Sequence, residues 1–328
     1  MQSLRVARNL QMSVLAIGIT LATIIPSAIL AEENRDNSFT EEDVRDLFWK
    51  GIDEAKAGRF PATQNELEKL LDTDPAFLPT KMCLEVIKEV SSNKINKEEA
   101  IRLFNSFDYT SDDEINQKAI PELNKVVTNS PKSSLVYCFR GLFYYGAKKF
   151  DEAIADFNQA IQKNPRNSSA YHGLADTYKA RSEYDQAIVN YSQAIKLEPK
   201  NAWVYHSHAE LLAKKGQYQE AISDYTIAIN LRPQNPWFYL HRGSAYKKIS
   251  QHEKALADYI KVTDMYGDDF YWVFRRQANL YKKLGCREEA EKAMEAYKQR
   301  YYFRRAMPGG QLADIEDKIE DILEEEDE

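Results

Sequence analysis

The feature that most constrains this chain is an internal period of 34 residues across its middle. One alanine series keeps that spacing over five positions: Ala119, Ala153, Ala187, Ala221 and Ala255. One proline series and two aromatic series keep it as well: Pro131, Pro165, Pro199 and Pro233; Phe157, Tyr191, Tyr225 and Tyr259; Tyr137, Tyr171, Tyr205 and Tyr239. Because these slots hold register over at least four copies, the period predicts a repeat protein, in which each copy buries its apolar face only against its neighbours.

Each copy is predicted to be a pair of helices. Tyr171, Leu174 and Tyr178 have the spacing of one face of a first helix, and Ala187 and Tyr191 continue that spacing on a second helix. A small residue recurs in the first helix of successive copies: Gly141, Ala175, Ala209 and Gly243. Small residues let the two helices approach, and the large aromatic residues fill the space around them. Asparagines recur as predicted N-caps of the first helices: Asn167, Asn201 and Asn235.

The slots resemble the tetratricopeptide-repeat (TPR) family, whose 34-residue units carry aromatic, Leu-Gly, Tyr, Ala, Phe and Pro positions in this order. The resemblance implies an all-α fold, a TPR α-solenoid in which helical hairpins form a right-handed superhelix. Residues 131–303 are expected to form the TPR array, with about five repeats, the last of which carries a one-residue insertion.

The flanking segments are assigned separately. Residues 41–130 are expected to form a divergent TPR-like helical region, because Gly51, Phe60, Leu67 and Pro75 keep the mutual spacing of their counterparts in the repeats. Helices are expected at about 80–92, 97–107 and 113–128, with the weakest joint at 108–113. Residues 304–328 are expected to form a hinge, an amphipathic helix and an acidic tail.

The first 31 residues are typical of an export signal. Arg5 and Arg8 precede an uncharged apolar stretch over residues 12–31, and Glu32 and Glu33 follow it. The stretch is long enough to span a bilayer, so it is either a signal peptide or an N-terminal membrane anchor. We therefore expect an extracytoplasmic protein (periplasmic, lumenal or secreted), which contacts a membrane only through residues 12–31 if they are uncleaved.

Charge and cysteine content exclude two classes of protein. The formal net charge is -7, and the acids concentrate after residue 313, where ten oppose one lysine. A nucleic-acid partner is not expected, because such a protein needs a basic face. The three cysteines are too few and too scattered for a disulfide framework, so Cys83, Cys138 and Cys286 are expected to be ordinary buried or half-buried thiols.

The sequence shows no catalytic or cofactor-binding motif, such as a phosphate-binding glycine loop, HExxH, CxxC or a nucleophile elbow. We expect no enzyme activity and no cofactor. Cys138, His172 and His206 share one slot of successive first helices. We expect no metal site there, because neighbouring helices lie about 8–10 Å apart and zinc requires ligands at about 2 Å.

The resemblance implies that the first helices line a concave groove, and that residues at their groove-facing slots bind a partner. These are aromatic, histidine and arginine, and lysine side chains, respectively: Trp203, Trp237 and Trp272; His172, His206, His241, Arg275 and Arg276; Lys179, Lys214, Lys247, Lys248, Lys282 and Lys283. Asp176, Glu210 and Asn279 occupy a further slot on this wall. Two alternatives stay open: the tryptophans pack against the next repeat, and the lysines only stabilise helix C-termini.

The expected function is that of an exported or membrane-tethered TPR scaffold, which mediates protein-protein interaction by holding a protein or peptide segment in its concave groove. The alternative is a non-catalytic subunit that binds glycan or cell-wall polymer through the tryptophan row. The lysine and asparagine clamp with which some TPR domains capture acidic chaperone tails is missing, since Cys138, Gly173 and Ser207 stand at corresponding positions.

Overall fold

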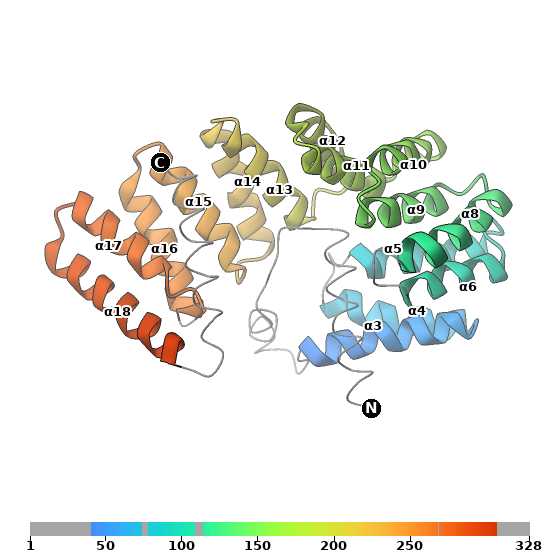
Figure 1. Ribbon diagram of the computed structural model, residues 1–328, viewed down its shortest axis with the longest axis horizontal. Helices are drawn as coiled ribbons and strands as arrows, with labels where there is room; N and C mark the ends of the chain where they lie inside the picture. Colours follow the sequence, from blue (N-terminus) through green and yellow to red (C-terminus); the bar gives the residue numbers. More distant parts are fainter. Residues whose placement is uncertain (1–40, 74–77, 109–113, 268, 307–328) are drawn as a thin grey trace. The chain divides into compact units, whose positions relative to one another are not determined.

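The computed structural model describes residues 41–73, 78–108, 114–267 and 269–306, and every regular element in these ranges is a helix (Figure 1). The predicted export segment and the acidic tail lie outside the described residues. Among the described helices, none is both long and apolar enough to cross a membrane. The chain divides into two compact units, which meet in sequence between Val204 and Tyr205.

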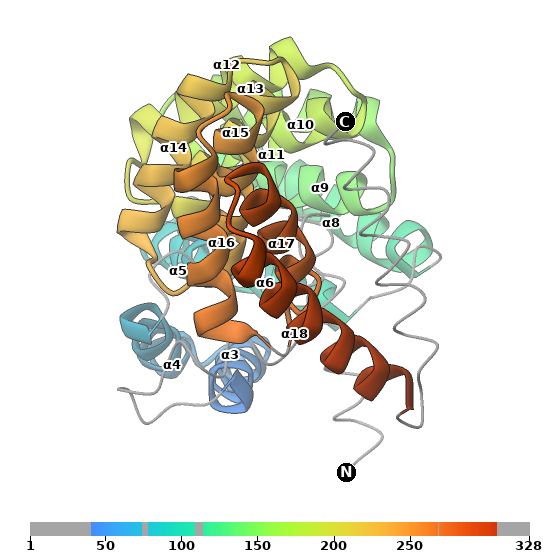
Figure 2. The ribbon, with the colours of Figure 1, turned by 90° about the vertical axis from the view of Figure 1, so that its left-hand side faces the viewer.

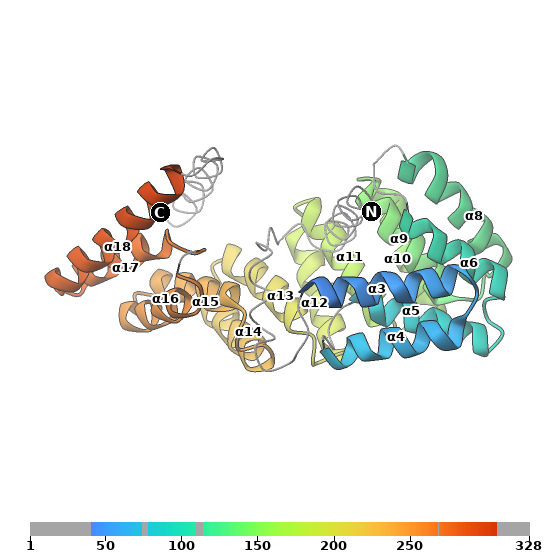
Figure 3. The ribbon, with the colours of Figure 1, turned by 90° about the horizontal axis from the view of Figure 1, so that it is seen from below.

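Within the described part of residues 41–129, the helical elements are α3 (Glu41–Lys56), α4 (Phe60–Thr73), α5 (Leu78–Ser91), α6 (Lys97–Asn105), the π-helix η2 (Ile115–Ala119) and α8 (Ile120–Asn129), with a short 3-10 turn η1 (Ser106–Asp108) after α6. Helices α3 and α4 lie side by side as a hairpin (Figure 3). Helix α6 contacts α3 and α8 as well as α5, so the two helices expected at 80–92 and 97–107 do not form an isolated hairpin.

Five helix pairs follow from residue 134: α9 (Ser134–Gly146) and α10 (Phe150–Lys163); α11 (Ser168–Ala180) and α12 (Tyr184–Leu197); α13 (Ala202–Lys214) and α14 (Tyr218–Leu231); α15 (Pro236–Lys248) and α16 (His252–Tyr266); α17 (Val273–Lys283) and α18 (Arg287–Ala306). In the first unit α9, α10, α11 and α12 pack on one another in turn, and in the second unit α14 to α18 do so, as Figure 2 shows for α14, α15 and α16. The prediction of an all-α fold built from TPR-like hairpins is confirmed.

The two helices of a hairpin pack closely where an aromatic ring of the second helix lies against a glycine of the first helix. A Cβ atom added to Gly243 would lie 2.7 Å from Cε1 of Tyr259, and one added to Gly141 would lie 3.0 Å from the Phe157 ring. Both rings are completely buried. Close packing of this kind leaves no room for a larger residue in the first helix. The predicted packing of large aromatic residues against small residues of the paired helix is therefore confirmed.

Capping side chains mark where the helices start, and residues with positive φ mark where the chain turns between them. The side chain of Asn167 accepts a hydrogen bond from the Ala170 amide, and that of Asn235 accepts one from the Trp237 amide, as expected for N-caps. Asn201 caps α13 in the same way. Each hairpin turn places one residue in the left-handed region: Lys148, Ser182, Gly216, Ser250 and Gly285.

All three cysteines are free thiols. Cys83 and Cys138 are buried and Cys286 is half-buried, as predicted. Burial raises the pKa of the Cys138 thiol to about 12, so it stays protonated and unreactive near neutral pH.

Candidate functional site

The predicted groove residues lie on the first helices of the hairpins, from α11 to α17. Trp203 and Trp237 occupy the first turns of α13 and α15, and Trp272 directly precedes α17. All three tryptophans are half-buried. Asn201 and Asn235 fix these positions, because each cap accepts a hydrogen bond from the amide of the tryptophan two residues later, at 3.2 and 3.0 Å.

Two of the tryptophans pack around one phenylalanine. The Trp237 ring meets Phe270 edge-on with the centroids 5.1 Å apart, and the Trp272 ring lies tilted against Phe270 at the same distance. Neither indole nitrogen has a hydrogen-bond partner among the described residues. The Trp237 ring therefore packs against the next repeat, as in one of the two alternatives, whereas Trp272 contacts a residue of its own connecting segment. Partner binding by the tryptophans stays a prediction.

His172 sits in a closed environment. Its side chain is only 5% exposed, and its Nε2 atom lies 3.5 Å from a carboxylate oxygen of Asp176. The ring also packs tilted against Tyr191, whose hydroxyl donates a hydrogen bond to Asp176. This histidine is tied into the hairpin formed by α11 and α12, and little of it is available to a partner.

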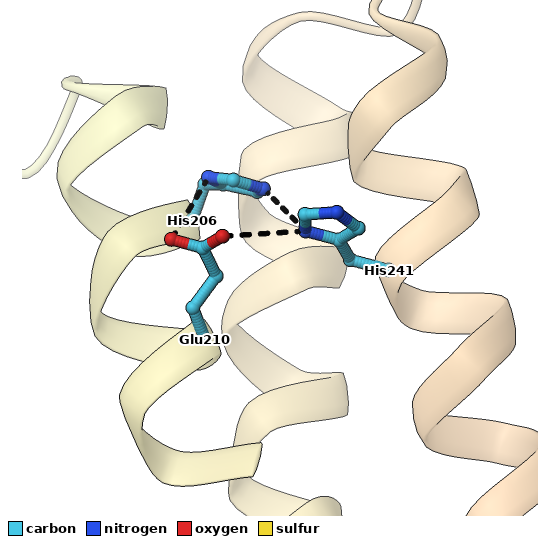
Figure 4. Close-up of side chains that lie close together, drawn as sticks. All are labelled: His206, Glu210 and His241. Carbon is cyan, nitrogen blue, oxygen red and sulfur yellow. Dashed lines mark hydrogen bonds and ion pairs between the residues drawn. The ribbon is translucent and has the colours of Figure 1, made fainter. Parts of the chain in front are cut away.

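His206 and His241 meet although they belong to different repeats. His206 Nε2 lies 2.8 Å from His241 Nδ1, and the two rings stack with centroids 4.8 Å apart. Glu210 completes the group, with one carboxylate oxygen 4.0 Å from His206 Nδ1 and the other 3.7 Å from His241 Nδ1 (Figure 4). We name these three residues the His-Glu cluster. Each offers a ligand atom, and the three atoms lie within 4.8 Å of one another.

The His-Glu cluster corrects the distance argument made from the sequence. Helix spacing of about 8–10 Å excludes contact between backbones, but imidazole and carboxylate side chains span much of that gap. His172 and His206 occupy equal slots of the repeats, whereas the contact joins His206 to His241, 35 positions later. The metal-binding potential of this pair was therefore missed.

The two arginines differ in their surroundings. Arg276 is 7% exposed; its Nη1 donates a 3.1 Å hydrogen bond to Ser244, and its guanidinium lies 5.9 Å from the centroid of the Tyr259 ring. Arg275 is half-buried. Of the two, Arg276 contributes to the contact between α15 and α17, and Arg275 is the more accessible to a partner.

The lysines stand in or next to the last turns of four first helices. Lys214, Lys282 and Lys283 are exposed, and Lys179, Lys247 and Lys248 are half-buried. Cations at helix C-termini are stabilised by the helix dipole, so these positions satisfy that structural role. The same placement repeats a positive charge at one end of each first helix from α11 to α17.

A set of buried ion pairs inside the hairpins was not predicted from the sequence. Arg140 binds Asp156 through two hydrogen bonds of 2.6 and 2.7 Å, and Arg242 binds Asp258 in the same way at 2.7 and 2.9 Å. Burial raises the pKa of both aspartates, and the guanidinium groups oppose that shift. The signal was present in the sequence, since in both pairs the partners stand 16 residues apart and the two arginines occupy the same repeat slot.

A pocket of about 560 Å³ lies in the first compact unit, bordered by α5 and by the loops before α11 and after α12. Its wall carries charges of both signs, among them Lys88, Glu89, Arg166 and Glu198. Burial raises the pKa of Glu89, opposed by the hydrogen bond from Ser133. The sequence does not single out these charged residues, because they come from segments far apart in the chain.

Comparison with known families identifies the repeats. Family models described as "TPR repeat" match residues 175–216 and 209–250, and models described as "Tetratricopeptide repeat" match residues 134–167, 157–189 and 238–269. Residues 134–269 thus carry tetratricopeptide repeats, as the sequence predicted. No protein in a search of curated sequences matches this chain.

Two solved structures share the fold. MamA is 22% identical, with a TM-score of 0.51 over 54% of this chain and 95% of its own. YrrB, a TPR protein with an unusual peptide-binding site, is 17% identical, with a TM-score of 0.51 over 60% of this chain and 97% of its own. At these identities the likeness concerns the fold.

Proposed function

We propose, from the tetratricopeptide repeats of residues 134–269, that this chain is a non-catalytic scaffold that binds an acidic protein segment along its first helices. TPR proteins with known structures include YrrB, which has a peptide-binding site. The likeness to YrrB concerns only the fold. The proposal about binding therefore rests on the side chains of this chain.

One observation carries the proposal: the first helices keep basic and aromatic side chains partly accessible, whereas the second helices bury their repeated aromatic residue. The second helices turn Phe157, Tyr191, Tyr225 and Tyr259 completely or almost completely into the core. The first helices keep large or charged side chains partly accessible, in particular Trp203, His241 and Arg275. A surface of half-buried aromatic and basic residues is typical of binding hot spots.

The charges favour an acidic segment. Six lysines occupy the C-terminal ends of four consecutive first helices, and Arg275 adds a further positive charge. Complementary charges increase the association rate and orient the partner. Because exposed charges are screened by salt, the affinity is expected to fall as ionic strength rises.

The scaffold is proposed to act outside the cytoplasm, delivered by residues 1–31 and either released or tethered through residues 12–31. A C-terminal reporter that is active only outside the cytoplasm tests this part. We expect the full chain to give reporter activity and a chain without residues 1–31 to give none. Reporter activity that survives the deletion would contradict export.

Glycan binding is the less favoured function. Sugars stack on open aromatic faces, whereas the rings of Trp237 and Trp272 both contact Phe270. No observation on the described residues favours a polymer over a protein segment.

The binding face is testable by site-specific photo-crosslinking. A photoreactive amino acid at Arg275, on first helix α17, is expected to capture the partner in the native compartment. The matched control places it at Val189, which lies on second helix α12 and is 67% exposed. Capture from position 275 and none from 189 supports the proposal, and the reverse pattern would place the binding face on the second helices.

A further inference from the structure

We propose that the His-Glu cluster binds one zinc ion between two consecutive repeats. His206 and Glu210 come from α13, one helical turn apart, and His241 comes from α15, the first helix of the next hairpin (Figure 4). Two residues four apart on a helix share a face, and the neighbouring helix supplies the third. The inference concerns metal binding and is independent of the proposed partner.

The spacing of the ligand atoms suits a tetrahedral ion. Zinc binds histidine nitrogen and carboxylate oxygen at about 2.0–2.2 Å, which places two ligands of a tetrahedron about 3.3 Å apart. In the cluster, His206 Nε2 and His241 Nδ1 are 2.8 Å apart, and His241 Nδ1 and Glu210 Oε1 are 3.7 Å apart. These two separations lie on either side of the required value, and all three ligand atoms lie within 4.8 Å of one another, so side-chain rotations would bring them onto one ion.

The donor set indicates which ion binds. Two neutral imidazoles and one carboxylate are ligands of zinc sites, which add a water or another ligand as the fourth. Magnesium and calcium prefer sites built from oxygen ligands. Two imidazole nitrogens at 2.8 Å must share a proton between them, and an ion would replace that proton while binding both nitrogens.

The surroundings hold one ligand rigid and leave the site open. The His206 side chain is only 2% exposed, and its ring packs against Tyr225 and Phe238 with centroids 5.7 and 5.2 Å away. Glu210 and His241 are 24% and 25% exposed, which gives a path of entry for the ion and a place for water. A rigid first ligand reduces the entropy lost on binding.

The preceding repeat contains a pair of residues that can be compared with the His-Glu cluster. His172 and Asp176 occupy the slots of His206 and Glu210 one repeat earlier, but Ser207 stands in the slot that His241 fills in the following repeat. The second imidazole is thus missing for that pair. The proposal therefore assigns zinc to the His-Glu cluster and not to His172. A bound ion would tie α13 to α15 and stiffen that joint of the array.

The test is a zinc titration of the full chain by calorimetry, together with thermal unfolding. We expect one site lost in both His241→Ala and Glu210→Gln, with affinity reduced at least about 100-fold, because even residues that only orient a ligand alter metal affinity 10–100-fold. Zinc should raise the unfolding temperature of the unaltered chain and not that of the variants. Magnesium at the same concentration should leave it unchanged.

His252→Ala is the matched control, since it removes a histidine from the same compact unit but outside the cluster. It should keep the affinity of the unaltered chain. Both cluster variants change partly exposed side chains, and circular dichroism verifies that they fold. The proposal is wrong if the unaltered chain binds no zinc, or if either cluster variant binds it as tightly as the unaltered chain does.

Discussion

The helices over residues 41–129 and the hairpins over residues 134–306 are both well packed, but different interactions hold them. In the first region the core is built largely from flexible or aliphatic side chains such as Ile52, Leu67 and Leu103, and ion pairs such as Arg102–Glu122 lie at the surface. In the hairpins, rigid aromatic rings pack closely against glycines, and arginine-aspartate pairs are largely buried. We therefore expect the repeats to tolerate substitution less than the region before them.

Breaking a buried ion pair is expected to give the largest effect. Asp258→Asn leaves the half-buried Arg242 guanidinium without its carboxylate, and loss of one partner from a buried pair costs about 3 kcal/mol or more in the free energy of unfolding. The side chains of Arg242 and Asp258 are 16% and 7% exposed. Urea denaturation measures the change.

Glu122→Gln is the counterpart in the first region. It breaks a 2.6 Å ion pair whose side chains are 40% and 33% exposed, so the expected loss is below about 1 kcal/mol. Equal losses for the two substitutions would remove the distinction between the regions.

Filling a glycine is expected to give an intermediate effect. In Gly243→Ala the new Cβ would lie 2.7 Å from the Tyr259 ring and 3.3 Å from a backbone oxygen of Ala255. Overpacking of this kind costs about 1–3 kcal/mol of unfolding free energy. Gly51→Ala places its Cβ 2.7 Å from Leu67 Cδ2, which can rotate away, so we expect little change. A larger loss in Gly51→Ala, measured by thermal unfolding, would contradict this account of the packing.

Relaxing a turn is expected to give the smallest effect. Ser250 has φ of 58°, a conformation that favours glycine, and the equivalent turns at Gly216 and Gly285 have glycine there. Ser250→Gly should stabilise the protein by about 0.5–1 kcal/mol. Asn93, before α6, has φ of 55°, but asparagine tolerates this region, so Asn93→Gly should be nearly neutral. Destabilisation by Ser250→Gly in a denaturant titration would show that the serine side chain matters more than the turn.

The repeats were predictable from the sequence because each position of the repeat recurs in several copies with the same type of residue. The register of Ala153, Ala187 and Ala221 sets the second helices, and the asparagine caps set the starts of the first helices. The helix at 97–105 was also predicted, but its contacts with α3 and α8 were not. When a helix does not recur in the sequence, its pattern shows which face is apolar but not which neighbouring helix covers that face.

The candidate site was only partly predictable. The lysine, arginine and tryptophan positions follow from the repeat register, but their exposure depends on side-chain packing, as Trp237 and Trp272 on either side of Phe270 show. The His-Glu cluster could not be predicted without knowing how far α13 and α15 are offset along their axes. The repeat period relates residues that are 34 positions apart, whereas His206 contacts His241, which lies 35 positions later.

The central claim is that an acidic segment binds along the first helices, and charge reversal within one hairpin tests it most directly. Lys282→Glu with Lys283→Glu alters first helix α17, and Lys292→Glu with Lys298→Glu makes the same charge change on second helix α18; all four lysines are exposed. The quantity to measure is the affinity for the partner captured from position 275. We predict at least a tenfold loss for the α17 variant, with a weaker salt dependence, and less than about a twofold loss for the α18 variant. The α17 variant should also unfold at a slightly lower temperature, because its lysines stabilise the helix C-terminus, but it should remain folded at the temperature of the binding measurement. Equal losses, or a loss only in the α18 variant, would contradict the claim.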